Sequence, residues 1–340
     1  MRENAMLRRL LHASYEIQAR VHSHEAPPRE LVDLAERSIL EVAHDDRRKD
    51  FRSIHDLLFA ELDKLEKLSV TGQSITGTPS GFDDLDRITG GFQPGNLVVL
   101  ASRPGMGKSS LAANFCEHAA LTDDKAVALF SLEMSEGELA QRFIASQASV
   151  KGDDLRKGKV PQTRWTKILA ASNRLAESHL FVDDSSDLSV LDVRAKVRRL
   201  AQQQADGLGL VLVDYLQLMR ATGPTDNRAE QVGQISRGLK TLARELDVPV
   251  IALSQLNRGV EQRADKRPML SDLRESGAIE QDADLVMFIY RDEYYDEDTE
   301  HEGLAELHIA KHRNGGLGTV RLTFQAEYPR FMSYVGEERY

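Results

Sequence analysis

The sequence contains a single cysteine, Cys116, and no apolar run long enough to form a membrane helix. One cysteine cannot make a disulfide within the chain or a zinc site built from several thiolates. A membrane helix needs roughly 18 consecutive apolar residues, and residues 1–9 lack the apolar core of a signal peptide. We therefore expect a cytoplasmic protein without membrane contact. The neighbours Phe115 and Ala119 predict that the thiol is buried and inert.

An excess of positive charge is also missing. Lys and Arg number 44 against 54 Asp and Glu, which gives a net charge of −10. Proteins that coat DNA are usually basic, because their cations displace counterions from the phosphates. The composition therefore argues against DNA binding over a broad surface. Any contact with nucleic acid would have to come from a local basic patch.

The first 75 residues have helical patterns. Leu31, Leu34, Ile39 and Val42 share one helix face. A sharper apolar stripe runs through residues 54–68 and predicts an amphipathic helix. That helix either packs on its own domain or docks on another subunit. The polar residues from 70 to 80 predict a linker.

From residue 97 onward the pattern predicts an α/β fold. Apolar runs alternate with helix-like segments, which is typical of a mainly parallel sheet covered by helices. Short strands joined by tight turns then predict an antiparallel extension at the sheet edge. The apolar runs lie at 97–100, 127–132, 210–213, 248–253 and 285–290, and the later strands at 305–310, 320–324 and 331–334.

A phosphate-binding loop is the strongest motif. The segment SRPGMGKS at 102–109 follows a strand and opens a helix, which is the P-loop arrangement, although Ser102 stands where the pattern has glycine. Glycines let the backbone N–H groups surround a phosphate, and the helix start adds its positive end. Lys108 would reach the β- and γ-phosphates of ATP, and the Ser109 hydroxyl suits Mg²⁺. The predicted nucleotide-binding residues are Ser102, Arg103, Pro104, Gly105, Met106, Gly107, Lys108, Ser109 and Ser110.

Polar residues follow three of the predicted strands. Asp214 ends an apolar strand, where its carboxylate either holds Mg²⁺ beside Ser109 or caps a turn. Glu133 follows another strand and either orients the attacking water or is a solvated helix cap. We expect Glu133 beside the loop of the first strand. Gln255 can bond the γ-phosphate, a weak signal by spacing alone.

Taken in order, these motifs resemble the replicative DNA helicases of the DnaB family, which are hexameric rings with a RecA-like core. The resemblance is close over 76–335 and weaker over 1–75. It is carried by SRPGMGKS at 102–109, SLEM at 131–134, VDYLQL at 213–218, SQLNR at 254–258, LRESGAIEQDAD at 273–284 and KHRNG at 311–315.

The resemblance implies roles for individual residues. Lys108, Ser109, Glu133, Asp214 and Gln255 match the family's nucleotide, magnesium, catalytic, Walker B and coupling residues. Lys311 and Arg313 match cations that reach the neighbour's nucleotide, with Arg313 as the arginine finger. Arg274, Glu275 and Gly277 match a DNA-contacting loop.

Elementary geometry bears on two of these assignments. Lys311 and Arg313 alternate along a strand and so point to one side, as a finger pair or as a solvated basic edge. The charged segment 257–275 is either a surface loop or, in a ring, the lining of a central hole. It has no aromatic residue, so we expect contact with the DNA backbone rather than base stacking.

The resemblance implies a helical remnant of the N-terminal domain at 1–48, a linker helix and linker at 49–75, and a RecA-like motor domain at 76–340. It implies an ATP-dependent 5′–3′ helicase, a homo-hexamer that encircles single-stranded DNA and unwinds duplex at the replication fork. Primase and a helicase loader are further implied partners, weakened because most of the family's N-terminal domain has no counterpart here. The alternatives are a RecA-like recombination ATPase and a non-unwinding, nucleotide-dependent assembly subunit.

Overall fold

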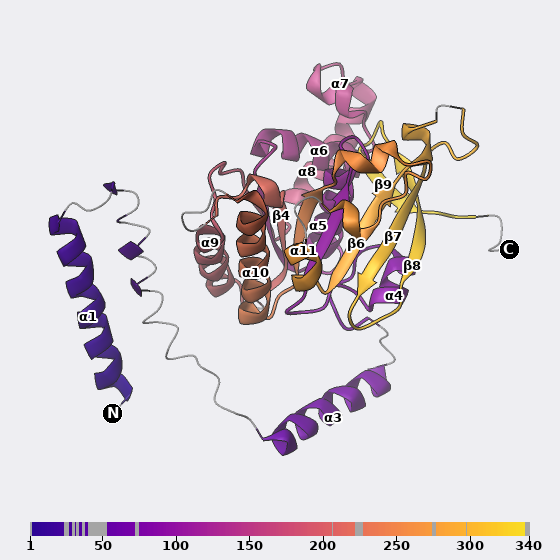
Figure 1. The fold of residues 1–340 in the computed structure, drawn as a ribbon. Coiled ribbons are helices and arrows are strands. Elements are labelled where there is room, and N and C mark those ends of the chain that lie inside the picture. Colours follow the sequence, from indigo (N-terminus) through magenta and orange to yellow (C-terminus); the bar gives the residue numbers. More distant parts are fainter. Residues whose placement is uncertain are drawn as a thin grey trace. The chain divides into compact units, whose positions relative to one another are not determined.

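The structure is a computed structural model that describes residues 2–23, 27–28, 31, 34–35, 38–39, 53–71, 75–205, 207–221, 227–273, 277–296 and 298–336. It divides into two compact units, residues 1–72 and 73–340 (Figure 1). Among the described residues, no helix is both long and apolar enough to cross a membrane.

The first unit contains the helices α1 (Arg2–Ser23) and α3 (Ile54–Thr71). The amphipathic helix predicted over 54–68 is confirmed by α3, which continues into the predicted linker. Leu58, Leu62 and Leu65 on α3 are more than half exposed, at 54%, 58% and 55%. The helix predicted around 31–42 lies largely outside the described residues, although Leu31, Leu34 and Ile39 themselves are helical.

The second unit is built on one nine-stranded sheet with the order β3-β2-β4-β5-β1-β6-β7-β8-β9. The strands from β3 to β6 in this order pair in parallel, whereas β7, β8 and β9 are antiparallel. The predicted mainly parallel sheet with an antiparallel C-terminal extension is confirmed. The strands are β1 (Leu97–Ser102), β2 (Ala126–Ser131), β3 (Leu180–Asp183), β4 (Leu208–Asp214), β5 (Val250–Gln255), β6 (Leu285–Tyr290), β7 (Leu304–His312), β8 (Gly318–Gln325) and β9 (Arg330–Ser333).

Helices cover both faces of this sheet. Successive strand side chains point to opposite faces, so Val98 and Leu100 of β1 pack with one helix layer and Leu97 and Val99 with the other. Figure 1 shows α9, α10 and α11 together on one face. The helices are α4 (Asp83–Thr89), α5 (Lys108–Leu121), α6 (Glu136–Ala148), α7 (Gly152–Arg156), α8 (Trp165–Ala176), α9 (Val190–Gln203), α10 (Arg228–Leu246) and α11 (Gly277–Asp282), with short 3₁₀ turns η1 (Gln162–Arg164), η2 (Leu216–Leu218), η3 (Arg258–Gln262), η4 (Leu270–Asp272) and η5 (Asp292–Tyr294).

The core around α5 includes Cys116. Its side chain is fully buried, and burial raises the pKa of the thiol far above its usual value. The prediction of a buried thiol on a helix is confirmed. β3 was not predicted, because its apolar run covers only the three residues 180–182, and its residues are half-buried or exposed.

The topology defines two edges of the sheet. β1 and β5 end in register at Ser102 and Gln255, and β2 and β4 end in register at Ser131 and Asp214. At the opposite edge, the first residue of β6 pairs with His312 of β7. Strands of this length separate the two edges by about 20 Å. We call them the carboxyl edge and the amino edge, after the ends of the parallel strands.

Candidate nucleotide site

The phosphate loop connects β1 to α5 at the carboxyl edge. Gly105 and Gly107 have φ angles of 81° and 94°, in the left-handed region that glycine adopts readily. Gly107 is the N-cap of α5 and has no side chain to cap the helix, so an anion can partner its first N–H groups. Ser102 lies within β1 and outside the left-handed region, which explains why serine serves at this position.

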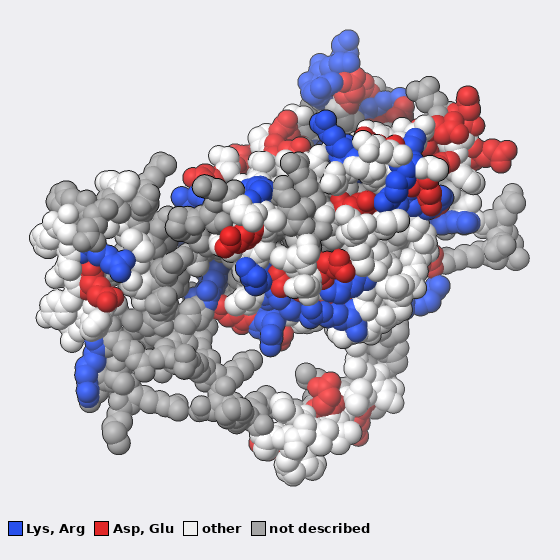
Figure 2. All heavy atoms as spheres, viewed as in Figure 1, with Lys and Arg blue, Asp and Glu red and all other residues white. Residues whose placement is uncertain are grey.

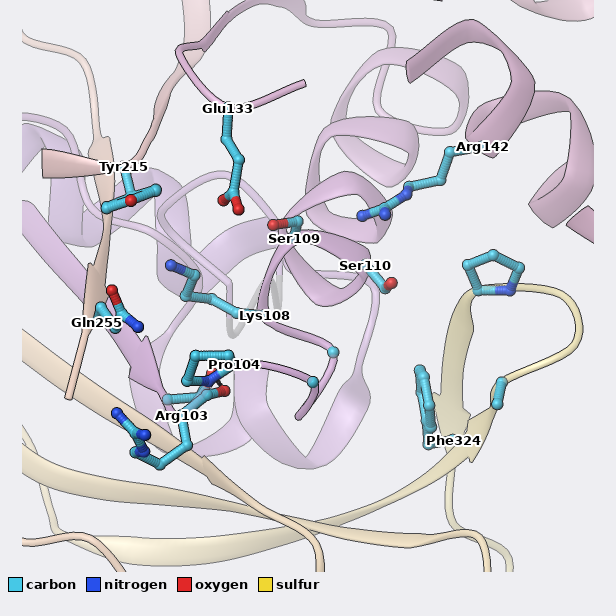
Figure 3. A pocket seen from close by; sticks show the side chains of 15 residues that line it. Arg103, Pro104, Lys108, Ser109, Ser110, Glu133, Arg142, Tyr215, Gln255 and Phe324 are labelled. Carbon is cyan, nitrogen blue, oxygen red and sulfur yellow. Dashed lines mark hydrogen bonds between the residues drawn. The ribbon is translucent and has the colours of Figure 1, made fainter. Parts of the chain in front are cut away.

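A cavity of about 480 Å³ opens beside this loop (Figure 3). It brings together most of the predicted site residues with several that the motifs did not indicate. Met106 is the exception among the loop residues, because its side chain is buried in the core. The predicted lining residues are Ser102, Arg103, Pro104, Gly105, Gly107, Lys108, Ser109, Ser110, Glu133 and Gln255, and the others are Arg142, Tyr215, Phe324, Ala326 and Pro329.

Lys108 lines the cavity, and Asp214, which is not among the lining residues, lies beside Lys108. Lys108 Nζ lies 4.0 Å from Asp214 Oδ1 and 4.6 Å from the centre of the Tyr215 ring. Burial lowers the pKa of Lys108, while the charges of Asp214 and Glu133 act in the opposite direction. Asp214 is only 4% exposed, and its Oδ1 has no hydrogen-bond partner within the described part of the chain. A buried carboxylate oxygen without a hydrogen-bond partner lowers the stability of the folded protein, unless a ligand or a water molecule binds it.

These residues fit a magnesium ion bound together with phosphates. The described residues hold no group of three or more His, Cys, Asp and Glu that would bind a metal alone. Mg²⁺ typically takes one or two protein oxygens and leaves the remaining positions to phosphate and water. The incomplete Asp214 carboxylate and the Ser109 hydroxyl match that donor set.

Glu133 reaches the same cavity from a more distant strand. β4 and β5 lie between β2 and β1, so Glu133 does not follow a neighbouring strand of the phosphate loop. A tight turn after β2 brings it in, because Ser131 Oγ donates to Met134 O at 2.7 Å and accepts from Met134 N at 3.1 Å. Figure 3 shows the exposed Glu133 carboxylate directed towards Lys108 and Ser109.

Arg142 is the main lining residue that motif reasoning missed. It comes from α6, and its guanidinium points towards Ser109 and Ser110 (Figure 3). Its Nη1 is buried without a hydrogen-bond partner among the described residues. Burial lowers the pKa of Arg142, opposed by nearby carboxylates, first that of Asp214. The available signal was position: Arg142 lies one turn after the buried Leu139, on the apolar stripe of α6.

The segment after Gln255 is tied to the phosphate loop. The side chain of Arg103 leaves the cavity: its Nη1 donates to Leu256 O at 2.9 Å and its Nε donates to Glu261 Oε1 at 2.7 Å. Gln217 holds the end of β5 through its Nε2, which donates to Ser254 Oγ at 2.9 Å.

Most basic residues of this segment are engaged within the chain. Arg263 makes a bidentate ion pair with Asp272, at 2.8 and 2.7 Å. Arg267 pairs with Glu306 at 2.8 and 2.9 Å. Lys266 Nζ lies 4.6 Å from the centre of the Tyr295 ring. The described part of the segment therefore offers less positive charge to a ligand than its count of basic residues indicates, and Arg258 is one of its exposed cations.

The predicted DNA loop is only partly visible. Arg274 and Glu275 lie outside the described residues, and Gly277 is the exposed first residue of α11. Gly277 is not among the residues that line the nucleotide cavity.

Lys311 and Arg313 lie at the amino edge, not in the cavity. Lys311 Nζ donates to the carbonyl of Glu280 and Arg313 Nη2 to that of Gln281, so both side chains reach α11. Arg313 Nη1 also lies 3.4 Å from Asp284 Oδ1. Figure 2 shows Lys and Arg side chains gathered in this region, below α10 and α11 in the view. The roughly 20 Å length of the strands separates them from the phosphate loop of their own chain.

Comparison with known proteins gives consistent matches. The sequence model of the family described as DnaB-like helicase C terminal domain matches residues 77–333. The chain is 46% identical over 332 residues to the replicative DNA helicase DnaC of Bacillus subtilis, covering 97% of this chain and 73% of that protein.

Solved structures agree with this match. A separately solved ATPase domain superposes with a TM-score of 0.81 at 42% identity, covering 84% of this chain and all of that domain. A DnaB-like replicative helicase, solved in a study of its interactions with primase, superposes with a TM-score of 0.78 at 38% identity, covering 98% of this chain and 78% of that one. The predicted RecA-like ATPase fold is confirmed.

Proposed function

This chain belongs to the family of DnaB-like replicative helicases and is an ATP-hydrolysing DNA helicase, and on that premise we propose how its residues act and assemble. One observation carries the proposal. The groups that bind and hydrolyse a triphosphate meet at the carboxyl edge, whereas the cations Lys311 and Arg313 lie at the amino edge. A site divided in this way needs a second copy of the chain to complete it.

The phosphate loop and Lys108 bind the β- and γ-phosphates of ATP. The Asp214 carboxylate and the Ser109 hydroxyl would hold Mg²⁺, and the buried Asp214 Oδ1, which has no hydrogen-bond partner among the described residues, supports this role. The bound ion would supply positive charge against the phosphates. Lys108 lies in a largely buried environment, where its charge acts on the phosphates with little screening by water.

Glu133 orients the attacking water and accepts its proton. Its carboxylate faces the position above Lys108 and Ser109 (Figure 3), where the γ-phosphate of a bound nucleotide would lie. Gln255 bonds the γ-phosphate and registers its loss, since it lines the cavity and begins the segment that leads to the DNA contacts. The Arg142 guanidinium, whose Nη1 has no hydrogen-bond partner among the described residues, adds a positive charge to the site from within the same chain.

A neighbouring copy supplies Lys311 and Arg313 to this site. An arginine at the transferring phosphoryl group is worth about 10³–10⁵ in rate. The basic amino edge is complementary to the negative triphosphate held at the carboxyl edge of the next copy (Figure 2). Repetition of this contact closes a ring, for which we propose a homo-hexamer. The exposed leucine stripe of α3 then grips an adjacent subunit.

The ring encircles single-stranded DNA and moves 5′ to 3′. The basic side chains of segment 257–273, with Arg274, Glu275 and Gly277 beyond it, contact the DNA backbone. Only local charge can do so in a protein with a net charge of −10. Primase is a proposed partner, because the related helicase was solved in a study of its interactions with primase, and a helicase loader is another.

The test compares hydrolysis with strand separation. The wild-type protein should hydrolyse ATP with Mg²⁺, faster with single-stranded DNA, and should unwind a forked duplex with a 5′ tail. Lys108→Ala should lose both activities while it keeps its fold by circular dichroism. Hydrolysis that ignores DNA, together with no unwinding of either tail polarity, would contradict the proposal.

A further inference from the structure

Arg103 belongs to the phosphate loop, but its guanidinium binds residues outside that loop. It is 9% exposed, and its guanidinium satisfies two partners outside the loop. It donates to Leu256 O at 2.9 Å, the residue directly after Gln255, and to Glu261 Oε1 at 2.7 Å in η3. A charged side chain buried beside a phosphate site would normally serve the phosphate. Here it binds the segment that leads away from that site.

The two ends of this connection lie 158 residues apart in the sequence. Both of its hydrogen bonds involve a charged group, and such bonds are about twice as strong as neutral ones. The Arg103 side chain is 10% exposed and that of Glu261 37%, so water screens the pair less than a pair on the open surface. Displacement of either loop alone would leave the buried guanidinium unpaired.

A neighbouring turn supports the same arrangement. Arg291 Nη1 donates to Gly105 O at 3.1 Å, and the Tyr294 ring lies so close that a Cβ on Gly105 would be 2.9 Å from it. Lys266 of the segment makes a cation–π contact with the ring of the next residue, Tyr295. The phosphate loop and the segment are therefore packed against the same turn as well as bound to each other.

We propose that the Arg103–Glu261 ion pair is a strap that makes the phosphate loop and segment 256–273 move together. The inference rests on the proposed function, in which nucleotide and DNA act at these two places. The strap passes a change at the phosphates to the DNA-contacting segment. In the reverse direction, DNA on the segment adjusts the phosphate loop and accelerates hydrolysis. Arg103 and Glu261 are positioning residues in this scheme and touch no reacting atom.

The experiment measures ATP hydrolysis with and without saturating single-stranded DNA. Glu261→Gln keeps the side-chain shape and removes the charge that holds Arg103. Its hydrolysis without DNA should stay close to that of the wild type, and its stimulation by DNA should fall roughly three- to tenfold, as coupling energies of this kind imply. Glu261→Asp keeps a carboxylate and should recover part of the stimulation.

The matched control is Asp265→Asn. It removes one negative charge from the same segment, but Asp265 is exposed and contacts Arg267 rather than Arg103. Its stimulation by DNA should remain at the wild-type level. If both variants lose stimulation equally, the charge of the segment matters and the strap does not. If Glu261→Gln is stimulated like the wild type, the strap is wrong although the proposed function stands.

A second readout needs no DNA. Amide exchange over 256–273 should slow when a non-hydrolysable ATP analogue with Mg²⁺ binds the wild-type protein, and Glu261→Gln should lose most of this change at equal nucleotide occupancy. Unchanged nucleotide-dependent protection in the variant would overturn the strap. A wild-type protein that neither responds to DNA nor unwinds it would overturn the proposed function, and the strap with it.

Discussion

Two buried aspartates at opposite edges of the same sheet differ in how their charges are satisfied. Asp214 at the carboxyl edge is 4% exposed and Asp284 at the amino edge is 5% exposed. Asp284 Oδ2 accepts hydrogen bonds from Leu97 N at 2.8 Å and Lys240 Nζ at 2.6 Å. Among the described residues, Asp214 Oδ1 has no hydrogen-bond partner, and Lys108 Nζ lies 4.0 Å from it, beyond hydrogen-bonding distance. The two aspartates are therefore equally buried, but the Asp284 carboxylate has its hydrogen-bond partners within the chain, whereas Asp214 Oδ1 has none among the described residues.

The comparison also explains how Arg313 can serve a neighbour. Its contact with Asp284 is a single one at 3.4 Å, and that aspartate already has Lys240 as its close partner. Arg313 can leave without stranding a buried charge, since its side chain is 47% exposed. Among the described residues, the Arg313 side chain also donates to the backbone carbonyl of Gln281 in α11. At the amino edge, Lys240 thus has a close ion pair with Asp284, whereas Arg313, the proposed catalytic cation, has a longer one.

The largest effect is expected for Arg313→Ala. Hydrolysis should fall about 10³–10⁵-fold, because the transferring phosphoryl group loses its arginine. Nucleotide binding and thermal stability should change little, since the lost contacts are exposed. Steady-state hydrolysis, nucleotide titration and thermal melting measure the three quantities.

Mixing variants separates action between copies from action within one copy. Arg313→Ala subunits keep Lys108, and Lys108→Ala subunits keep Arg313, so exchange of subunits should restore a fraction of the hydrolysis that neither variant shows alone. A mixture that stays inactive after exchange would place Arg313 outside the neighbour's site and break the contrast between the two edges.

The aspartates themselves give the next largest effect. Asp214→Asn should lower hydrolysis on the order of 10³-fold, the value of several kcal/mol of metal-assisted stabilisation, with little loss of folding stability. Asp284→Asn should show the reverse pattern. It removes the charge that pairs with Lys240, whose side chain is 19% exposed and still donates to Gly95 O at 2.8 Å. The cost is therefore at most about 3–5 kcal/mol of folding free energy. Urea unfolding measures the stability of the two variants, and ATP hydrolysis per folded molecule measures their activity. If the two variants behave alike, Asp214 and Asp284 do not differ in role.

The residues that the motifs indicated lie together at the carboxyl edge, because their placement depends on short-range patterns. Lys108 and Ser109 belong to one contiguous loop, and Asp214 and Gln255 each end an apolar strand. Parallel strands bring such ends to a common edge, so their meeting follows from the fold class. Both the parallel sheet and its antiparallel extension could be read from the alternation of apolar runs.

The missed residues depend on packing between distant segments. Arg142 faces the cavity only because α6 packs beside α5, and an isolated helix gives no reason to bury an arginine. Phe324 and Pro329 arrive with the C-terminal hairpin, which folds back towards the phosphate loop. The Arg103–Glu261 pair joins residues 158 positions apart. The apolar stripe of α6 indicates that Arg142 faces the protein, but no local periodicity shows which distant segment a residue contacts.

A third buried carboxyl sharpens the comparison, because burial alone does not make a site. Glu117 lies on α5, the helix that Lys108 begins, but it is 4% exposed outside the nucleotide cavity. Its Oε2 accepts hydrogen bonds from Asn114 Nδ2 and Ser146 Oγ, each at 2.9 Å. Burial outweighs these bonds and raises the pKa of Glu117 to about 7. We expect this carboxyl to affect stability and not catalysis.

The sign of the pH dependence follows from that pKa. The folded protein holds the proton of Glu117 more tightly than the unfolded chain, so stability from this group is greatest below pH 4.5 and is lost as pH rises through about 7. Glu117→Gln cannot ionise and should be more stable than the wild type at pH 8, by up to about 3 kcal/mol, with the difference vanishing below about pH 4. Melting curves of both proteins across this pH range measure the difference in stability. The two proteins should hydrolyse ATP at the same rate at pH 8. A variant that is equally destabilised at every pH would show that Glu117 is ionised and paired in the folded state, like Asp284.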